Sequence, residues 1–241
     1  MEKKAYIFDL YGTLADIWTD ESKPELWSTM AELYGVYGAD YTPEELKSEY
    51  LRLCAEKERK LGGQFPEIEL SEVFSELLRR DRAVASPAGD GFIHMAANVF
   101  RIISRNRLCE MPGAHEVLRE LRHRGKKLLL LSNAQAVFTI PELEKLGLYD
   151  YFDRIFISSD HGIKKPDPRF IAKLLDLENL RPEDCVMIGN DFSSDMRVAA
   201  SCGVEGIFLN SDGYSEEELF RNTHRFPRGT VKVINSLIEL I

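Results

Sequence analysis

The sequence predicts an α/β protein in which a doubly wound, Rossmann-like parallel sheet carries an inserted helical cap. Short apolar runs alternate with helical segments in the second half of the chain, which is typical of a parallel sheet covered by helices. Residues 16–105 contain no convincing strand and several helical patterns. The 241 residues, 44% of them hydrophobic, are enough for a large core and a smaller inserted unit.

The first predicted strand is the apolar run 5–8, which ends on Asp9. Gly12 then supplies a turn and Thr13 a hydroxyl. Because ligands of open parallel sheets bind outside the carboxyl ends of the strands, we expect Asp9 at the functional edge. The plain alternative is an aspartate that caps a turn or a helix.

The stretch 16–105 is predicted to be helical. Leu26, Met30 and Leu33 recur at helical spacing, and Thr42 followed by Pro43 is a typical helix start. Helices are expected over residues 25–34, from 43 towards 62, and over 69–80 and 91–104.

Strand and helix alternate again after residue 105. The continuous apolar run 128–131 indicates a central strand that is buried on both faces. Further strands are predicted at 154–157, 186–188 and 206–209, and helices at 115–123, 141–146, 168–175, 196–202 and 231–240. We therefore expect an α/β core formed by residues 1–15 and 106–241, with residues 16–105 as a helical insert.

Composition narrows the possible partners. The net charge is -9 and no long basic run occurs, which argues against nucleic acid or an anionic membrane. The four cysteines have no metal-ligand spacing, nothing resembles a signal peptide, and no apolar run is long enough to span a bilayer. We expect a cytoplasmic protein with reduced thiols that acts on a small molecule, and the oligomeric state stays open.

Polar groups follow the strands that a parallel sheet would align. Besides Asp9, Ser132 and Asn133 follow the run 128–131, and Asn190 and Asp191 follow the run 186–188. The loop 162–168 between them brings Lys164 and Lys165 before a Pro-Asp-Pro turn. A carboxylate, donors and a cation at one edge suit nucleophilic attack on an electrophile that carries negative charge.

These four segments resemble the motifs of the haloacid dehalogenase superfamily of aspartate-nucleophile hydrolases. The motifs are Asp-Leu-Tyr-Gly-Thr at 9–13, Ser-Asn at 132–133, Lys165 before Pro-Asp-Pro, and Gly-Asn-Asp at 189–191 with Asp195. The resemblance implies that Asp9 forms a covalent ester and that Ser132 and Asn133 bind the oxygens of the transferred group. It also implies that Lys165 balances the negative charge of the nucleophile and the substrate, and that residues 16–105 are a mobile cap.

The first motif departs from the phosphatases of this superfamily, which usually carry a second aspartate two residues after the nucleophile. Tyr11 occupies that position. A tyrosine, with an ordinary pKa of about 10, could supply a proton to the leaving group but would be a poor base for the return step. The Tyr-Gly-Thr form is similar to that of 2-haloacid dehalogenases, whose halide leaves without a proton. Packing of Tyr11 against the cap is the plain alternative.

The fourth motif resembles the phosphatases instead. In them Mg²⁺ is held by the nucleophile, a main-chain carbonyl two residues later and a fourth-motif side chain, which implies Asp9, Tyr11 and either Asn190 or Asp191, with Asp195 nearby. Stabilisation of a helix N-terminus is the alternative role of Asp191 and Asp195. Dehalogenases place uncharged groups there, carry a tyrosine where this chain has Ile171, and have a cap arginine without a clear match here.

The resemblance thus implies a Mg²⁺-dependent phosphatase of a small phosphorylated metabolite. One alternative is a metal-independent 2-haloacid dehalogenase. Another is a catalytically weak relative that binds a phosphorylated ligand or partner as a regulator, an interpretation that the missing second aspartate favours.

Overall fold

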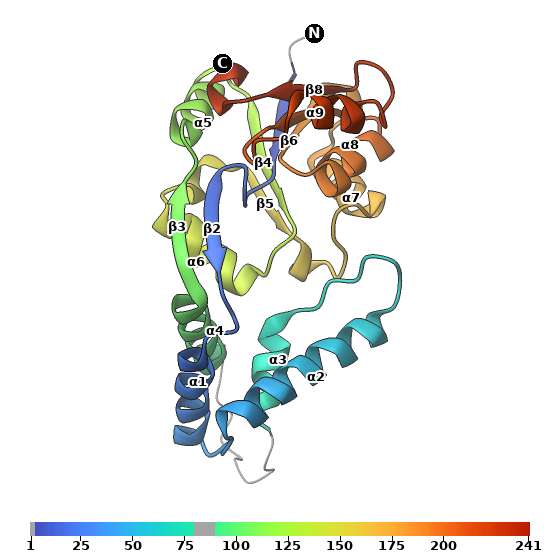
Figure 1. Ribbon diagram of the computed structural model, residues 1–241. Coiled ribbons are helices and arrows are strands. Elements are labelled where there is room, and N and C mark those ends of the chain that lie inside the picture. The colour runs from blue at the N-terminus through green and yellow to red at the C-terminus, as the bar shows by residue number, and fades with distance from the viewer. Residues whose placement is uncertain (1–2, 80–89) are drawn as a thin grey trace.

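The computed structural model describes residues 3–79 and 90–241. Its main sheet has six parallel strands in the order β5-β4-β1-β6-β7-β8 (Figure 1). The strands are β1 (Ala5–Phe8), β4 (Lys127–Ser132), β5 (Arg154–Ile157), β6 (Cys185–Gly189), β7 (Glu205–Leu209) and β8 (Val231–Ile234). This confirms the predicted doubly wound sheet. The strand order reverses beside β1, and ligands bind at such switch points.

Helices cover both faces of the sheet because alternate residues of each buried strand point to opposite sides. Phe8, Leu128 and Leu130 pack towards α5 (Ala114–His123) and α6 (Ala136–Lys145). Their neighbours Ile7, Leu129 and Leu131 share a cluster with residues of α7 (Pro168–Glu178) and α8 (Arg197–Ser201). The continuous apolar run of β4 therefore serves two cores.

A helical unit lies beyond the carboxyl end of the sheet (Figure 1). It consists of α1 (Pro24–Val36), α2 (Pro43–Leu61), α3 (Leu70–Leu77) and α4 (Asp90–Ser104). Its own aromatic core includes Trp27, Tyr50 and Phe100. Thr42 and Glu45 form a capping box that confirms the predicted start of α2. The predicted helix 69–80 ends earlier, and its last residue lies outside the described residues.

Two strands that flank this helical unit were not expected. β2 (Ala15–Thr19) and β3 (Arg105–Glu110) pair antiparallel in a ribbon that connects the helical unit to the sheet (Figure 1). The prediction that residues 16–105 contain no convincing strand is therefore wrong for β2. The ribbon is largely solvated and its sequence, Arg-Asn-Arg-Leu-Cys-Glu in β3, lacks the apolar alternation by which half-buried strands are found.

The predicted closing helix at 231–240 is also wrong. Its first part is strand β8, and a short 3₁₀ turn, Leu237–Leu240, follows a capping box at Ser236. A short apolar run such as Val-Lys-Val-Ile does not separate helix from strand by periodicity alone. Two further differences concern α9 (Glu216–Thr223), which was not expected, and the π-helical turn Phe192–Met196 that precedes α8.

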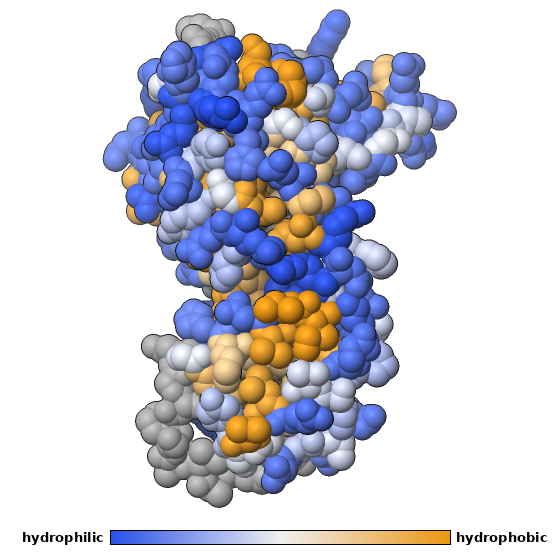
Figure 2. All heavy atoms as spheres, turned by 90° about the vertical axis from the view of Figure 1, so that its left-hand side faces the viewer, coloured by the Kyte–Doolittle hydropathy of each residue, from blue (hydrophilic) through white to orange (hydrophobic). Residues whose placement is uncertain are grey.

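The surface is polar over most of the sheet unit, but apolar atoms gather on the face of the helical unit seen in Figure 2. Val36 of α1 and Ile102 of α4 are 82% and 63% exposed. Within residues 3–79 and 90–241, no helix combines the length and the apolarity that crossing a membrane requires.

Candidate active site

The carboxyl edge of the sheet brings almost all predicted site residues to one cavity of about 380 Å³. It lies beside the strand-order reversal, where the ends of β1, β4 and β6 meet. Its lining consists of Asp9, Tyr11, Asn133, Lys165, Asn190, Asp191, Ser194, Asp195, Asp212 and Tyr214. Of the predicted residues, only Ser132 is outside this lining.

A buried ion-pair cluster forms the floor of the cavity. Lys165 Nζ lies 2.6 Å from Asp9 Oδ1 and 2.8 Å from Asp195 Oδ1. It also donates to the carbonyl of Leu131 at 2.8 Å. Burial alone would lower the pKa of Lys165, but the charges of Asp195 and Asp9 outweigh it and raise that pKa. The lysine is therefore a permanent cation at neutral pH.

At Asp195, burial and the charge of its ion-pair partner act on the pKa with the opposite signs. Burial raises its pKa to about 6, Lys165 opposes this rise, and the charge of Asp9 adds to it. Gly189 makes its position possible, because a Cβ on Gly189 would lie 2.2 Å from Asp195 Oδ2. The main-chain N–H of Asp191 also donates to Asp195 Oδ2 at 3.1 Å. Two carboxylates thus share one ammonium group.

Asp9 presents its second oxygen with much weaker contacts. Thr13 Oγ1 donates to Asp9 Oδ2 at 3.3 Å, while Oδ1 takes the short contact with Lys165. The main-chain N–H of Asp9 donates to Ile188 of β6 at 2.9 Å and fixes the residue at the strand end. A carboxylate oxygen at a cavity wall, held but not saturated with hydrogen bonds, can act as a nucleophile.

The two residues of the second motif, Ser132 and Asn133, differ in their contacts. Asn133 accepts from Lys165 N at 2.7 Å and donates to Lys165 O at 2.9 Å, so its amide fixes the lysine loop. Ser132 is 1% exposed and its Oγ has no hydrogen-bond partner. Buried hydroxyls are rarely left without a partner, so Ser132 is available to a bound group.

Tyr11 lines the cavity, but its hydroxyl is bonded away from it. The hydroxyl donates to Glu142 Oε2 at 2.5 Å and lies 3.1 Å from Thr139 Oγ1, both on α6. Burial first, and then the charge of Glu142, raise the pKa of Tyr11 well above its ordinary value. The phenol is therefore neutral and its proton is directed to Glu142.

Glu142 was not among the predicted site residues. It is 2% exposed and pairs with Arg101 at 2.8 Å and Arg105 at 3.0 Å, which come from α4 and β3. Nothing in a single glutamate within a predicted helix distinguishes a buried partner from a solvated one, because the two arginines lie about forty residues away in the sequence.

The fourth motif places its two neighbouring residues differently. Asp191 accepts from Ser193 and Ser194 and caps the turn that follows. Asn190 instead lies against the loop after β1: Thr13 Oγ1 is 3.4 Å from its Oδ1, and a Cβ on Gly12 would lie 2.2 Å from its Nδ2. Gly12 (φ +83) is thus required both for its turn and for this close approach.

Three lining residues were not foreseen, Ser194 in the fourth motif and two that follow β7. Asp212 and Tyr214 follow β7, and Asp212 Oδ2 lies 3.4 Å from Asn190 Nδ2. The main-chain N–H of Tyr214 donates to the side chain of Asn210 at 2.7 Å. The signal was present in the sequence, since Asn-Ser-Asp-Gly follows a predicted strand at the same edge of the sheet.

The oxygen atoms near Asp9 are the possible ligands of a metal ion at this site. Among the described residues, no three His, Cys, Asp or Glu side chains are arranged as a complete metal site. Asp9 and Asn190 offer oxygens on facing loops, whereas Asp195 is held by Lys165 and Asp191 by two serines. The set fits an ion such as Mg²⁺ that keeps several of its own waters.

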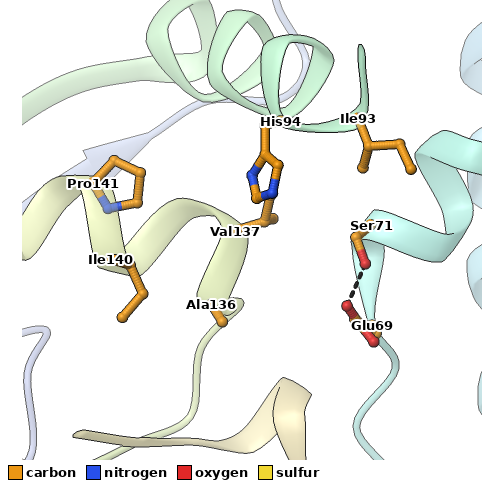
Figure 3. Close-up of a pocket in the computed structure, with 8 residues that line it drawn as sticks. All are labelled: Glu69, Ser71, Ile93, His94, Ala136, Val137, Ile140 and Pro141. Carbon is orange, nitrogen blue, oxygen red and sulfur yellow. Dashed lines mark hydrogen bonds between the residues drawn. The ribbon is translucent and has the colours of Figure 1, made fainter. Parts of the chain in front are cut away.

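A second cavity, of about 480 Å³, lies between α3, α4 and α6 (Figure 3). Its walls are mostly apolar, with His94 in the middle and hydrogen-bonded Glu69 and Ser71 at one side (Figure 3). It contains none of the predicted site residues, so the chemistry is sought in the polar cavity at the sheet edge.

Comparisons with known proteins agree with the motifs. A family model described as haloacid dehalogenase-like hydrolase matches residues 3–203. The chain is 28% identical over 206 residues to the glyceraldehyde 3-phosphate phosphatase of Pyrococcus abyssi, covering 86% of this chain and 81% of that protein. It is 27% identical over 215 residues to the phosphoglycolate phosphatase of Nitrosospira multiformis, covering 88% and 85%.

Other matches are shorter. The match to the glyceraldehyde 3-phosphate phosphatase of Pyrococcus furiosus, at 30% identity, spans 46% of this chain and 47% of that protein, so the chain matches about half the length of this relative.

Among solved structures, the 2-haloacid dehalogenase from Pseudomonas syringae pv. Tomato DC3000 is similar in fold. Its TM-score is 0.69 at 24% identity, and the alignment covers 100% of this chain and 96% of that one. Together with the match over residues 3–203, the four motifs and their sheet place the chain in the haloacid dehalogenase-like hydrolase family.

Proposed function

We propose that this hydrolase is a Mg²⁺-dependent phosphatase of a small phosphorylated metabolite, with Asp9 as the nucleophile. The observation that carries the proposal is the set of contacts of Asp9, which lines the cavity: its Oδ1 is 2.6 Å from Lys165 Nζ, while its Oδ2 has one long contact, with Thr13. The phosphatases among its relatives support the same chemistry.

In the proposed reaction, Asp9 Oδ2 attacks phosphorus and the bond from phosphorus to the ester oxygen breaks. Ser132 Oγ, which has no protein partner, donates to an oxygen of the transferred group. The leaving alkoxide takes its proton from water, because the Tyr11 proton is directed to Glu142. A second water then attacks phosphorus, Asp9 leaves as a carboxylate, and the released proton neutralises the hydroxide formed in the first step.

Asp9, the main-chain carbonyl of Tyr11 and Asn190 would hold the Mg²⁺. Its capping role makes Asp191 the weaker candidate of the two that the sequence left open. When bound, the ion would offset the negative charge of the phosphoryl oxygens. Asp195 would act through Lys165, which it holds against Asp9.

We further propose that residues 16–105 are the cap of a core formed by residues 1–15 and 106–241. Two contacts between these parts support this division, one at Glu142 and one around Glu67. A cap that closes over the cavity would exclude water from the reacting groups.

The test is a panel of phosphate monoesters and chloroacetate, assayed with Mg²⁺ and after treatment with EDTA. Release of phosphate that requires Mg²⁺ supports the proposal. Turnover of esters that EDTA leaves unchanged would contradict the metal requirement. The metal ligands are tested by the Mg²⁺-induced rise in melting temperature, which Asn190→Ala should reduce more than Asp191→Ala.

A metal-independent 2-haloacid dehalogenase is the second candidate, favoured by Tyr11 in place of the second aspartate. It predicts chloride release from chloroacetate in the presence of EDTA. A catalytically weak binding or regulatory protein, the third, predicts saturable binding of a phosphorylated ligand without turnover of any compound in the panel.

A further inference from the structure

The polar cavity is strongly acidic. Four of its lining residues are aspartates, and its lining contains a single cationic side chain, Lys165. Even with one Mg²⁺ bound, four carboxylates would face three positive charges. A second anionic group on a substrate would therefore enter a region that already carries excess negative charge.

Lys165 is already engaged by groups of the protein. It donates to Asp9 Oδ1 at 2.6 Å and to the carbonyl of Leu131 at 2.8 Å, and it forms an ion pair with Asp195 at 2.8 Å. The lysine side chain is 1% exposed, so a substrate carboxylate would have to displace one of these partners.

Cations near the cavity are engaged with other groups. Arg101 and Arg105 both pair with Glu142, and Lys164 lies 3.8 Å from Glu67. Arg197 packs over the ring of Phe65 at 5.8 Å, and it does not line the cavity.

Two cations of helix α2 are also paired within the helical unit. Arg52 pairs with Glu49 and Glu56, and Lys57 pairs with Glu72 and Glu76. These contacts balance the charge within the helical unit itself.

Two aspartates line the cavity away from the buried cluster, and one of them, Asp191, accepts from Ser193 and Ser194. The other, Asp212, is exposed, follows β7 and stands 3.4 Å from the amide of Asn190 on the adjoining loop. Its carboxylate has no cationic partner among the described residues. A carboxylate of a substrate would be repelled here, whereas a hydroxyl or an ammonium group could donate to Asp212.

We infer that the site selects phosphate monoesters whose leaving group is neutral or cationic, and that Asp212 is a specificity-determining residue that rejects a second anionic group. The inference rests on the proposed phosphatase activity. Polyol, hydroxyaldehyde and amino-alcohol phosphates fit this class, and phosphorylated carboxylic acids do not.

The test uses pairs of esters of similar size with Mg²⁺ present. Glycerol 3-phosphate is compared with 3-phosphoglycerate, and phosphoethanolamine with phosphoglycolate. We expect kcat/KM to be about tenfold or more lower for the carboxylate member of each pair, in line with the cost of placing like charges together. Asp212→Asn should raise kcat/KM for 3-phosphoglycerate more than for glycerol 3-phosphate. The ratio of the two kcat/KM values, glycerol 3-phosphate over 3-phosphoglycerate, should therefore fall.

Asp150→Asn is the matched control, because Asp150 is exposed and lies outside the cavity lining. It should leave the ratio as it is. Equal or faster turnover of the carboxylate esters would overturn the inference while leaving the phosphatase proposal in place, and so would a ratio that Asp212→Asn does not move. No turnover of any of the four esters or of p-nitrophenyl phosphate would overturn the phosphatase proposal and the inference with it.

Discussion

Two of the contacts between the helical unit and the sheet unit differ in chemistry. The hinge network, formed by Tyr11, Arg101, Arg105 and Glu142, is a buried ionic contact on the side of the β2–β3 ribbon. Glu142 is 2% exposed there, and the side chains of Arg101 and Arg105 are 14% and 17% exposed. Arg101 also lies over the ring of Phe138, with its guanidinium carbon 5.0 Å from the centroid.

The loop contact is formed by Glu67, Gln135, Ser158 and Lys164. It joins the segment between α2 and α3, which contains Glu67, to three residues of the sheet unit. Ser158 donates to Glu67 at 2.9 Å and Gln135 donates to it at 3.1 Å, while Lys164 stays 3.8 Å away and is 34% exposed. Burial first raises the pKa of Glu67, and Lys164 and the hydrogen bonds only partly oppose it.

The difference indicates which contact is permanent. Breaking the hinge network would leave buried charges without partners. When the loop contact opens, water can replace the lost hydrogen-bond partners at a small cost in free energy. We therefore expect the helical unit to pivot about the hinge network while the loop contact opens and closes beside Lys165.

The largest effect is expected from Glu142→Gln. This change keeps the shape but removes the carboxylate with which Arg101 and Arg105 both pair, so the free energy of unfolding should fall by about 3–5 kcal/mol. Urea denaturation monitored by circular dichroism measures it.

Glu178→Gln is the matched control for that change, since Glu178 also joins two cations, Lys127 and Arg154. Those partners are 36% and 45% exposed, so the loss should be about 1 kcal/mol or less. Equal losses in the two variants would remove the distinction between a buried hinge and an ordinary surface ion pair.

A smaller effect is expected from Gln135→Ala. The side chain of Gln135 accepts from the N–H of Leu70 at 2.8 Å and donates to the carbonyl of Ile68 at 2.8 Å as well as to Glu67. Its loss should cost about 1–3 kcal/mol locally and speed amide hydrogen exchange in residues 62–70.

Gln64→Ala, in the same loop but exposed, should leave that exchange as it is in the wild type. If Gln135→Ala instead speeds exchange evenly through α5 and the main sheet, the loop contact is part of the global fold and does not open separately.

The smallest effect concerns the pH dependence of the loop contact. The folded-state pKa of Glu67 is raised, so the folded protein binds this proton more tightly than the unfolded chain. Its contribution to stability is therefore present below the ordinary value of 4.5 and is lost as the pH rises through the raised value.

Glu67→Gln imitates the protonated form and tests this sign. The variant should be at least as stable as the wild type at neutral pH, and the difference between their melting temperatures should shrink as the pH falls towards 4.5. A wild type that gains stability over the variant with rising pH would show that Lys164 dominates at Glu67.

The sequence predicted the regular part of the fold because burial and periodicity determine it. The apolar run of β4 and the Thr42–Pro43 helix start are local signals, and both are found in the structure. The β2–β3 ribbon and β8 were missed because their pairing with distant segments, and not their own pattern, makes them strands.

The same division holds at the site. Residues that follow predicted strands, such as Asp9 and Asn133, line one cavity with Lys165, because the topology of a parallel sheet brings them to one edge. Glu142 could not be found, since its importance comes from arginines in another unit. The direction of the Tyr11 hydroxyl depends on that same glutamate.

Asp9→Asn tests the proposed nucleophile most directly, with glycerol 3-phosphate and p-nitrophenyl phosphate as substrates in the presence of Mg²⁺. The variant keeps the shape of the side chain and removes its charge, so kcat/KM should fall by about 10³-fold or more. Its melting temperature should show that it is folded, since Asp195 still pairs with Lys165. A folded Asp9→Asn variant with kcat/KM within about tenfold of the wild type would contradict catalysis through a covalent bond to Asp9.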